Sequence, residues 1–325
     1  MRFCIVFCGF LLAAANVYAE ESRVNVDWLK IMAFAAHQTN YSGVFVYQYD
    51  DHVKTSRITH VVEPDSEYER LESLDGPKRE IIRHHGHVWR SSSDNQMVQV
   101  DSQGGRPRFP SLLPEQLSAL NENYRLKELG NERVAGYNAM VVLLKPKDNM
   151  RYAHKIWVHT DTGLLLRVAV LGDKSQIVEQ YTFTQLQIGG DIDHSWIKRA
   201  PAVIARNGNE DLPELAEKAK GAIPFKSGWV VDAIPPGFKK TMEVQRPMRG
   251  KHAPVTQLVF SDGLSGISVF IEEVDADEDD ADGLSSRGAL NLYRKVVDVH
   301  LITVVGEVPA RVVMQVLDSV RYNGK

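Results

Sequence analysis

Apolar and polar residues alternate along much of the first two-thirds of the chain. The stretch YSGVFVYQY places Phe45, Tyr47 and Tyr49 on one face and Val44 and Val46 on the other, as a β-strand does. The same period recurs in segments separated by turn residues, which predicts an antiparallel meander. Its strands are expected at residues 41–49, 53–62, 68–74, 78–85, 124–130, 137–145, 152–160, 163–171 and 175–188, with HVWRSSS and MVQV continuing the series after Gly86.

Helical spacing of apolar residues is confined to a few places. The segment from Val26 to Gln38, behind a candidate N-cap at Asn25, predicts a helix, and a shorter one is expected at Pro114–Leu120. The segment PARVVMQVLDSVRY, with Pro309 at its start, predicts a helix near the end of the chain. Its apolar face is expected to consist of Ala310, Val313, Met314, Leu317 and Val320.

Residues 189–221 lack a sustained period and are interpreted as a linker. Short strands resume beyond it, and the C-terminal helix is expected to cover one face of their sheet. The fold class is therefore α+β, mainly antiparallel β. We expect a signal peptide at 1–19, a first domain at 20–188, the linker at 189–221 and a small α+β domain at 222–325. The strands of the second domain are expected at 229–232, 238–246, 254–261, 265–273, 291–298 and 300–306.

The first 19 residues have the pattern of a secretory signal. Arg2 precedes an apolar core from Phe3 to Ala15, which is shorter than the ~20 residues of a membrane-spanning helix, and Val17-Tyr18-Ala19 resembles a cleavage site. Both cysteines of the chain, Cys4 and Cys8, lie inside this segment. A mature chain without cysteine excludes thiol catalysis and cysteine-ligated metal, and export without disulfides favours the periplasm.

Composition narrows the class of partner and of chemistry. The chain has 38 Lys and Arg against 42 Asp and Glu, which does not favour nucleic acid. No metalloprotease motif, phosphate-binding loop or dinucleotide-binding glycine motif is present, and GLSG at 263–266 is not a nucleophile motif because Ile267 follows it. We therefore expect a protein that is not an enzyme and that needs no cofactor.

Two segments resemble metal sites. In His84-His85-Gly86-His87 no further ligand follows at a supporting spacing, so the segment is interpreted as the exposed tip of a hairpin. In the acidic run 272–282, Asp275, Asp277 and Asp279 match the first ligands of a calcium loop. Its sixth position is Asp rather than Gly and its twelfth is Ser rather than Glu, which favours a solvated loop. No metal is expected.

The sheet of the first domain has more apolar surface than the predicted helices cover. An antiparallel sheet with one strongly apolar face has to bury that face. The available cover is the helix at 26–38, the segment at 114–120 and loops. Two interpretations stay open at this point: an ordinary core, or a curved sheet that keeps a hydrophobic cavity for a lipid-like ligand.

Five stretches resemble the RseB/MucB family, periplasmic regulators of the envelope-stress sigma factor. The likeness covers nearly the whole mature chain, but the family pattern does not include the acidic run 275–282 or the histidine cluster. The stretches are LDGPKREIIRHHGHVW (74–89), RVAGYNAMVVLLKPKDNMRYAHKIWVHTDTGLLLRV (133–168), EQYTFTQLQI (179–188), FSDGLSGISVFIEEV (260–274) and ITVVGEVPARVVMQVLDSV (302–320).

The resemblance implies a first domain similar to the lipoprotein carriers LolA and LolB, an unclosed, curved antiparallel sheet with covering helices. It implies that the second domain binds the periplasmic region of a membrane-spanning anti-sigma factor and shields it from proteolysis. Lipopolysaccharide or lipoprotein acyl chains entering the first domain are expected to release that partner. A periplasmic lipid or lipoprotein carrier is the alternative, and self-association is a further possibility.

Candidate binding residues follow as hypotheses from this resemblance and from the strand pattern. The residues expected to face an acyl chain are Phe45, Tyr47, Ile156, Val158, Leu166 and Val168. The basic residues expected to meet lipid phosphates are Lys78 and Arg79. The residues expected on the partner surface are Arg246, Met248, Arg249, Leu264 and Ile267.

Overall fold

The computed structural model describes residues 26–84, 86–91, 97–100, 108–113, 118–197, 225–246, 253–274 and 283–324. The first domain is an eleven-stranded antiparallel sheet with strand order β6-β5-β4-β3-β2-β1-β11-β10-β9-β8-β7. Its strands are β1 Tyr41–Tyr49, β2 His52–Glu63, β3 Ser66–Ser73, β4 Glu80–His84, β5 His87–Ser91, β6 Met97–Val100, β7 Tyr124–Val134, β8 Tyr137–Pro146, β9 Ala153–His159, β10 Leu165–Leu171 and β11 Ile177–Ile188.

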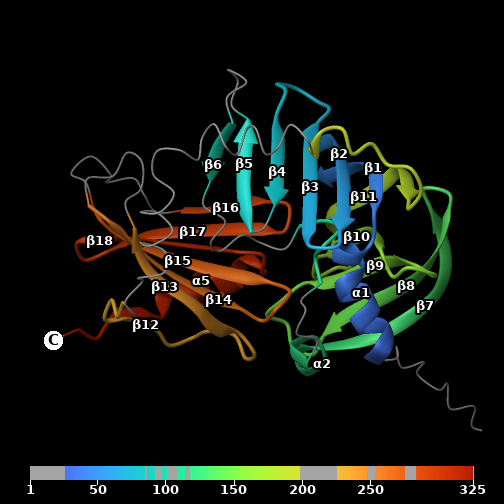
Figure 1. The fold of residues 1–325 in the computed structure, drawn as a ribbon. Helices are drawn as coiled ribbons and strands as arrows, with labels where there is room; N and C mark the ends of the chain where they lie inside the picture. The colour runs from blue at the N-terminus through green and yellow to red at the C-terminus, as the bar shows by residue number, and fades with distance from the viewer. Residues whose placement is uncertain are drawn as a thin grey trace, which may run out of the picture.

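The sheet is open and strongly curved. Strand β1 pairs with both β2 and β11, so Tyr41 lies opposite His60 on one side and Ile188 on the other, while β6 and β7 form the two ends. Figure 1 shows that β1 to β6 stand nearly at right angles to β7 to β10 in the view, with helix α1 (Val26–Gln38) between them. The expected unclosed, curved antiparallel sheet is confirmed.

Helix α1 contributes to the main core of the first domain. Met32, Ala33 and Ala36 are buried against sheet residues, as the helical period predicts. The second helix, α2, spans Ser118–Asn123 and overlaps the predicted helix at 118–120. It continues three residues further than predicted, and residues 114–117, where the predicted helix begins, lie outside the described part of the chain.

The histidine segment forms the tip of a hairpin. His84 ends β4 and lies opposite His87, the first residue of β5, and Gly86 has φ of +73°, which the tight turn between them requires. His84 stacks on Tyr68 with ring centroids 4.1 Å apart, while His85 lies outside the described residues. The hairpin interpretation is confirmed. Within the described ranges, no three His, Cys, Asp or Glu side chains are placed to hold a metal ion.

The first domain continues past the end of β11. Ile192, Trp196 and Ile197 are buried in a second, smaller core with residues of β2, β3, β4 and β5. The chain therefore still packs on the sheet at residue 197, inside the segment expected to be a linker. Ile192, Trp196 and Ile197 cover the face of the sheet that α1 does not reach.

The second domain is a six-stranded antiparallel sheet, order β13-β14-β15-β18-β17-β16, with a small sheet of β12 and β19 beside it. Helix α5 (Ala310–Asp318) covers one face, as expected, through Val312, Val313, Val316 and Leu317. Met314 is exposed instead, and Val320 belongs to a strand. The strands are β12 Trp229–Val231, β13 Lys239–Arg246, β14 Val255–Ser261, β15 Gly266–Glu273, β16 Gly283–Arg287, β17 Leu290–Val297, β18 His300–Gly306 and β19 Val320–Tyr322.

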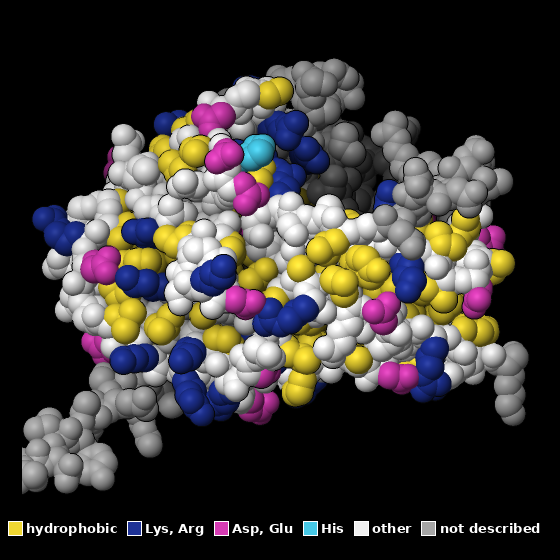
Figure 2. Space-filling model, turned by 180° about the vertical axis from the view of Figure 1, so that it is seen from behind, with side chains coloured by type: hydrophobic (Ala, Val, Ile, Leu, Met, Phe, Trp, Pro, Cys, Tyr) yellow, Lys and Arg dark blue, Asp and Glu magenta, His cyan; other side chains and the backbone are white. Residues whose placement is uncertain are grey.

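Charged side chains of both signs are interspersed with hydrophobic side chains over the rear face of both domains (Figure 2). Among the helices of the described residues, none is long and apolar enough to span a bilayer.

Candidate ligand cavity and domain interface

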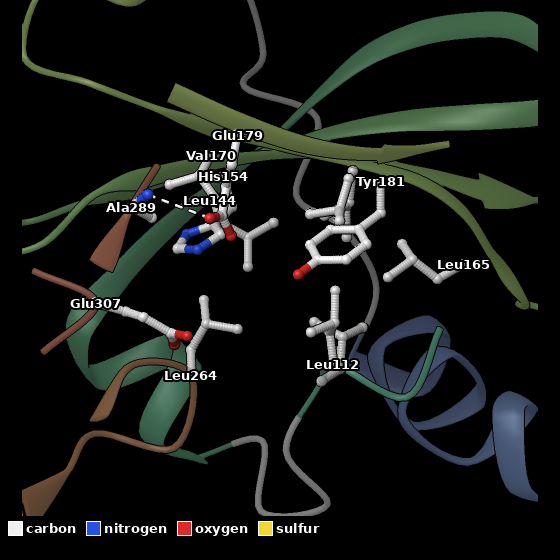
Figure 3. A pocket seen from close by; sticks show the side chains of 13 residues that line it. Leu112, Leu144, His154, Leu165, Val170, Glu179, Tyr181, Leu264, Ala289 and Glu307 are labelled. Atoms are coloured by element: carbon white, nitrogen blue, oxygen red, sulfur yellow. Dashed lines mark hydrogen bonds between the residues drawn. The ribbon is translucent and has the colours of Figure 1, made fainter. Parts of the chain in front are cut away.

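A cavity of about 60 Å³ lies between the two domains. Most of its wall is the inner face of the first-domain sheet, and the second domain contributes Leu264, Ala289 and Glu307. Figure 3 shows Tyr181 and Leu165 on one side, His154 and Ala289 on the other, and the Tyr181 hydroxyl pointing inward. The first-domain residues of the wall are Leu112, Leu113, Leu144, His154, Ile156, Leu165, Val168, Val170, Glu179 and Tyr181.

Strand register brings these wall residues together. In an antiparallel sheet, directly opposed residues point to the same face. One such row contains Ile156, Val168 and Tyr181, and the next contains His154, Val170 and Glu179. Two adjacent rows across β9, β10 and β11 therefore form an apolar wall, with Tyr181 and Glu179 on the β11 side and His154 on the β9 side.

The closed cavity is too small for a lipid chain. Pockets for drug-sized ligands are typically ~300–1,000 Å³, whereas ~10–15 Å³ is enough for one water molecule. The volume of about 60 Å³ therefore holds a few waters at most. A larger ligand has to displace either the second domain or the loop that contains Leu112 and Leu113.

Six of the eight predicted lipid-binding residues occupy three environments. Ile156 and Val168 line the cavity. Phe45 is buried under Phe109, with ring centroids 5.3 Å apart, and Tyr47 stacks on Tyr181 at 4.3 Å without reaching the cavity wall. Lys78 and Arg79 are exposed in the loop before β4 and do not belong to the wall.

A β-bulge accounts for the remaining two. The register of β10 with β9 shifts between Leu165 and Arg167, so Leu165 lies opposite Val158 and Leu166 is the extra residue. Leu165 therefore takes the position in the wall that strict alternation assigned to Leu166. Val158 and Leu166 are fully buried in the core and do not line the cavity.

A buried ion pair joins the two domains next to the cavity. Arg151 Nη1 donates to Asp262 Oδ2 at 2.6 Å, and neither side chain is exposed at all. Asp262 also accepts from the Tyr124 hydroxyl at 3.2 Å, while the Arg151 guanidinium lies 5.1 Å from the centre of the Phe238 ring. Burial, and then the charge of Asp262, raises the pKa of Tyr124, so this hydroxyl stays a donor.

The turn between β16 and β17 forms a second contact across the interface. The Ala289 amide donates to Glu179 Oε2 at 3.1 Å, and Arg287 lies over the Tyr49 ring at 4.8 Å. Gly288 has φ of +57°, and a Cβ there would lie 2.8 Å from Glu179 Oε2. Glycine is required at this position both for its backbone conformation and for the close approach of the turn.

One titratable group of the wall is strongly perturbed. Burial lowers the pKa of His154 to about 4, and the charge of Asp262 offsets part of that effect. His154 is therefore neutral at neutral pH. A charged imidazolium is unfavourable in this site because the closed interface removes it from water.

The predicted partner residues do not form one exposed surface. Ile267 is completely buried in the core of the second domain, so it is not available to a partner, because β15 is an inner strand whose odd-numbered residues face α5. Leu264 lines the interdomain cavity instead. Arg246, at the end of β13, is half-buried and donates to Gln257. Met248 and Arg249 lie outside the described residues.

Sequence reasoning did not identify the interface residues. Arg151 and Asp262 are 111 positions apart, and neither belongs to a local motif. Both lie in stretches that carry the family resemblance, Arg151 in 133–168 and Asp262 in 260–274, and this was the available signal.

Comparison with known proteins assigns both halves of the chain. The model of the MucB/RseB N-terminal domain matches residues 25–201, and that of the MucB/RseB C-terminal domain matches residues 224–321. The Pseudomonas aeruginosa protein named sigma factor AlgU regulatory protein MucB is 31% identical, over 98% of this chain and 96% of its own length. The Escherichia coli K12 protein named sigma-E factor regulatory protein RseB is 24% identical, over 97% and 95%.

Solved structures agree over the whole fold. The complex of Pseudomonas aeruginosa MucA and MucB contains a chain that is 30% identical, with a TM-score of 0.72, over 92% of this chain and 99% of that one. A structure of MucB alone is also 30% identical, with a TM-score of 0.63, over 91% and 97%. With both domain models matched and the two-domain architecture shared, the chain belongs to the MucB/RseB family.

Proposed function

We propose that this protein is a periplasmic regulator that binds the periplasmic region of a membrane-spanning anti-sigma factor and shields it from proteolysis. Lipopolysaccharide or lipoprotein acyl chains entering the interdomain cavity release that partner. The names of its relatives, which are sigma factor regulatory proteins, and the existence of a MucA/MucB complex support the choice of partner. The secretory pattern of residues 1–19 supports the periplasm.

One observation carries the mechanism: the cavity is lined by both domains. A ligand shifts a conformational equilibrium only by its differential affinity for the two states. An acyl chain fits the open arrangement and not the closed cavity of about 60 Å³, so its binding free energy favours separation of the domains. A partner that contacts the closed arrangement is then bound less tightly.

A catalytic role is not part of the proposal. Glu179 accepts hydrogen bonds from Tyr47 and from the Ala289 amide, and His154 is neutral and enclosed. A lipid carrier of the same fold is the alternative. The interdomain wall favours regulation, since a carrier has no evident need of a second domain that closes its cavity.

The test is calorimetric titration of the protein with the periplasmic fragment of the anti-sigma factor of the same organism, with and without lipopolysaccharide. We expect tight binding that lipopolysaccharide weakens. Binding that is unchanged by lipopolysaccharide refutes the release mechanism. Absence of fragment binding, with lipid still bound, supports the carrier instead.

A cavity variant separates the two binding events. Ile156→Trp places a larger side chain in the wall, at a cost in stability of about 1–3 kcal/mol for overpacking. We expect it to bind the fragment but to lose release by lipopolysaccharide. The matched control is Val53→Trp, an exposed residue of β2, which leaves both unchanged. Equal release from the two variants contradicts the assignment of the cavity.

A further inference from the structure

We propose that Arg83 and Arg108 form a phosphate-binding site on the inner face of the first-domain sheet. The ligand of the protein is then an anionic amphiphile, with its phosphate at these arginines and its acyl chain in the neighbouring apolar cavity. This inference rests on the proposed lipid-controlled regulation and names the chemical class of the lipid. It places the charged group at residues other than Lys78 and Arg79, which are exposed in a loop.

Arg83 carries hydrogen-bond donors that the described residues do not satisfy. It lies in β4 opposite Glu69 of β3, and its Nη1 forms an ion pair with Glu69 Oε1. Its Nε and Nη2 are buried and have no hydrogen-bond partner among the described residues, and 19% of the side chain is exposed. A guanidinium keeps its proton under all ordinary conditions. A buried donor without an acceptor is unfavourable, and an incoming anion removes that cost.

Arg108 adds a second positive charge beside Arg83. The bridge between Arg108 and Ser111 holds this loop against the same part of the sheet, because Ser111 Oγ lies 2.7 Å from His37 Nε2, and His37 Nδ1 lies 2.8 Å from Glu67 Oε1 in β3, the strand that also contains Glu69. Burial lowers the pKa of Arg83 to about 10, and the charge of Arg108 lowers it further in the same direction, so the two guanidinium groups are electrostatically coupled. Arg108 forms no ion pair with the described residues. Glu69 neutralises only one of the two arginines. A phosphate, with several acceptor oxygens and up to two negative charges, matches a pair of guanidinium forks.

The other nearby carboxylate is already engaged. Glu67 accepts from His37 at 2.8 Å and from His60 at 2.9 Å. Burial would raise its pKa, but these two hydrogen bonds bring it down to about 2. The Glu67 carboxylate is therefore ionised and is bound by His37 of α1 and His60 of β2.

The arginine site and the cavity are joined by one short loop. Arg108 precedes Phe109, whose ring lies 5.6 Å from that of Tyr181 and 5.3 Å from that of Phe45. Leu112, in the same loop, lines the cavity. A ligand that replaces the Phe109 ring therefore meets apolar side chains on one side and guanidinium groups on the other, which is the polarity of a phosphorylated lipid.

The experiment compares two single-chain detergents below their critical micelle concentrations, dodecyl phosphate and neutral dodecyl maltoside, by calorimetry at fixed ionic strength. We expect Arg83→Gln and Arg108→Gln each to weaken dodecyl phosphate about tenfold, the loss of one charge-assisted hydrogen bond. Dodecyl maltoside affinity stays within about twofold for both variants. Lys78→Gln is the matched control and changes neither affinity.

Losses that are equal for the two detergents, or that Lys78→Gln reproduces, overturn the proposal. Inorganic phosphate alone is the third probe, and we expect it to compete with dodecyl phosphate but to bind more weakly. Inorganic phosphate that binds as tightly as dodecyl phosphate overturns the amphiphile assignment. If Arg83→Gln does not fold, Arg108→Gln decides, because its side chain lies at the surface of a loop.

Fragment binding by the detergent-free variants is measured in parallel. A variant that binds the anti-sigma fragment normally but distinguishes the detergents less well supports the phosphate site. If the wild-type protein binds no fragment, the proposed regulation fails, and the ratio of the two detergent affinities still tests the arginine site.

Discussion

Arg151→Met is the substitution that most directly tests the coupling of the two domains. In the wild-type protein the guanidinium and the Asp262 carboxylate are 2.6 Å apart, and both are fully buried. Methionine keeps much of the apolar contact with the ring of Phe238 but removes the charge. The variant leaves a carboxylate enclosed at the interface.

The size of the effect follows from what Asp262 retains. Removing one partner of a buried ion pair typically costs about 3–5 kcal/mol. Asp262 keeps hydrogen bonds from Tyr124, from the Leu264 amide at 2.9 Å and from the Ser265 amide at 2.7 Å. We therefore expect the lower limit, about 3 kcal/mol, which raises the equilibrium constant for domain opening about a hundredfold.

The assay measures the distance between the domains. Nitroxide labels on cysteines introduced at Leu129 in β7 and Val299 after β17, both exposed, report that distance by pulsed electron paramagnetic resonance. We expect one short distance in the wild-type protein and a longer, broader distribution in Arg151→Met. Asp262→Asn in the same background gives the coupling energy through a double-mutant cycle.

The control is another ion pair across the same interface. Arg311 pairs with Asp173 at 2.5 Å, but the two side chains are 45% and 61% exposed. Arg311→Met is expected to cost no more than about 1 kcal/mol and to leave the distance unchanged. An unchanged distance in Arg151→Met, with a loss of overall stability, refutes the role of the buried pair in holding the domains together.

Three further outcomes are expected. Burial lowers the pKa of His154 to about 4. The contribution of His154 to the wild-type free energy of unfolding is therefore constant above about pH 6.5 and falls by about 3 kcal/mol as the pH drops to 4. His154→Phe is expected to lack this pH-dependent loss in urea titrations at a series of pH values. Gly288→Ala places a Cβ 2.8 Å from Glu179 Oε2 at a residue with φ of +57°, so we expect the interface to open in the same distance assay. A distance distribution as short as that of the wild type contradicts the close fit of this turn against Glu179. Glu67 has a pKa of about 2, so the stabilisation that its carboxylate gives is present above about pH 4.5 and is lost as the pH falls towards 2. We expect Glu67→Gln to be less stable than wild type at pH 7 and equally stable at pH 2. A difference in stability that stays constant with pH contradicts the ionic origin.

Local pattern was sufficient for most of the fold. The boundaries of α1 and β1 agree with the predicted ones, because a period of 3.6 or 2 is imposed by the backbone itself and is visible within one element. The strand β16 was not predicted, since all five of its residues are exposed and it lacks an apolar face. Met314 was assigned to the wrong face of α5 because a single helix turn leaves two adjacent faces similarly apolar.

The site depended on information that no local window contains. Periodicity indicated that Ile156 and Val168 face the interior, and both line the cavity. Periodicity assigned the next position of the wall to Leu166, but Leu165 occupies it. One extra residue in β10 reverses the alternation, and this bulge arises from the pairing of β10 with β9. It gave no indication that Leu264 closes the cavity from the second domain.

The sequence by itself determined the elements, the order of two domains and the family, because these follow from short-range periodicity and from motifs that are continuous along the chain. Only the tertiary structure decided that the cavity lies between the domains, that Arg151 meets Asp262, and that Arg83 keeps two donors without an acceptor among the described residues. The physical reason is that burial and the pairing of charges depend on which distant segments exclude water together, and that is a property of the packed chain.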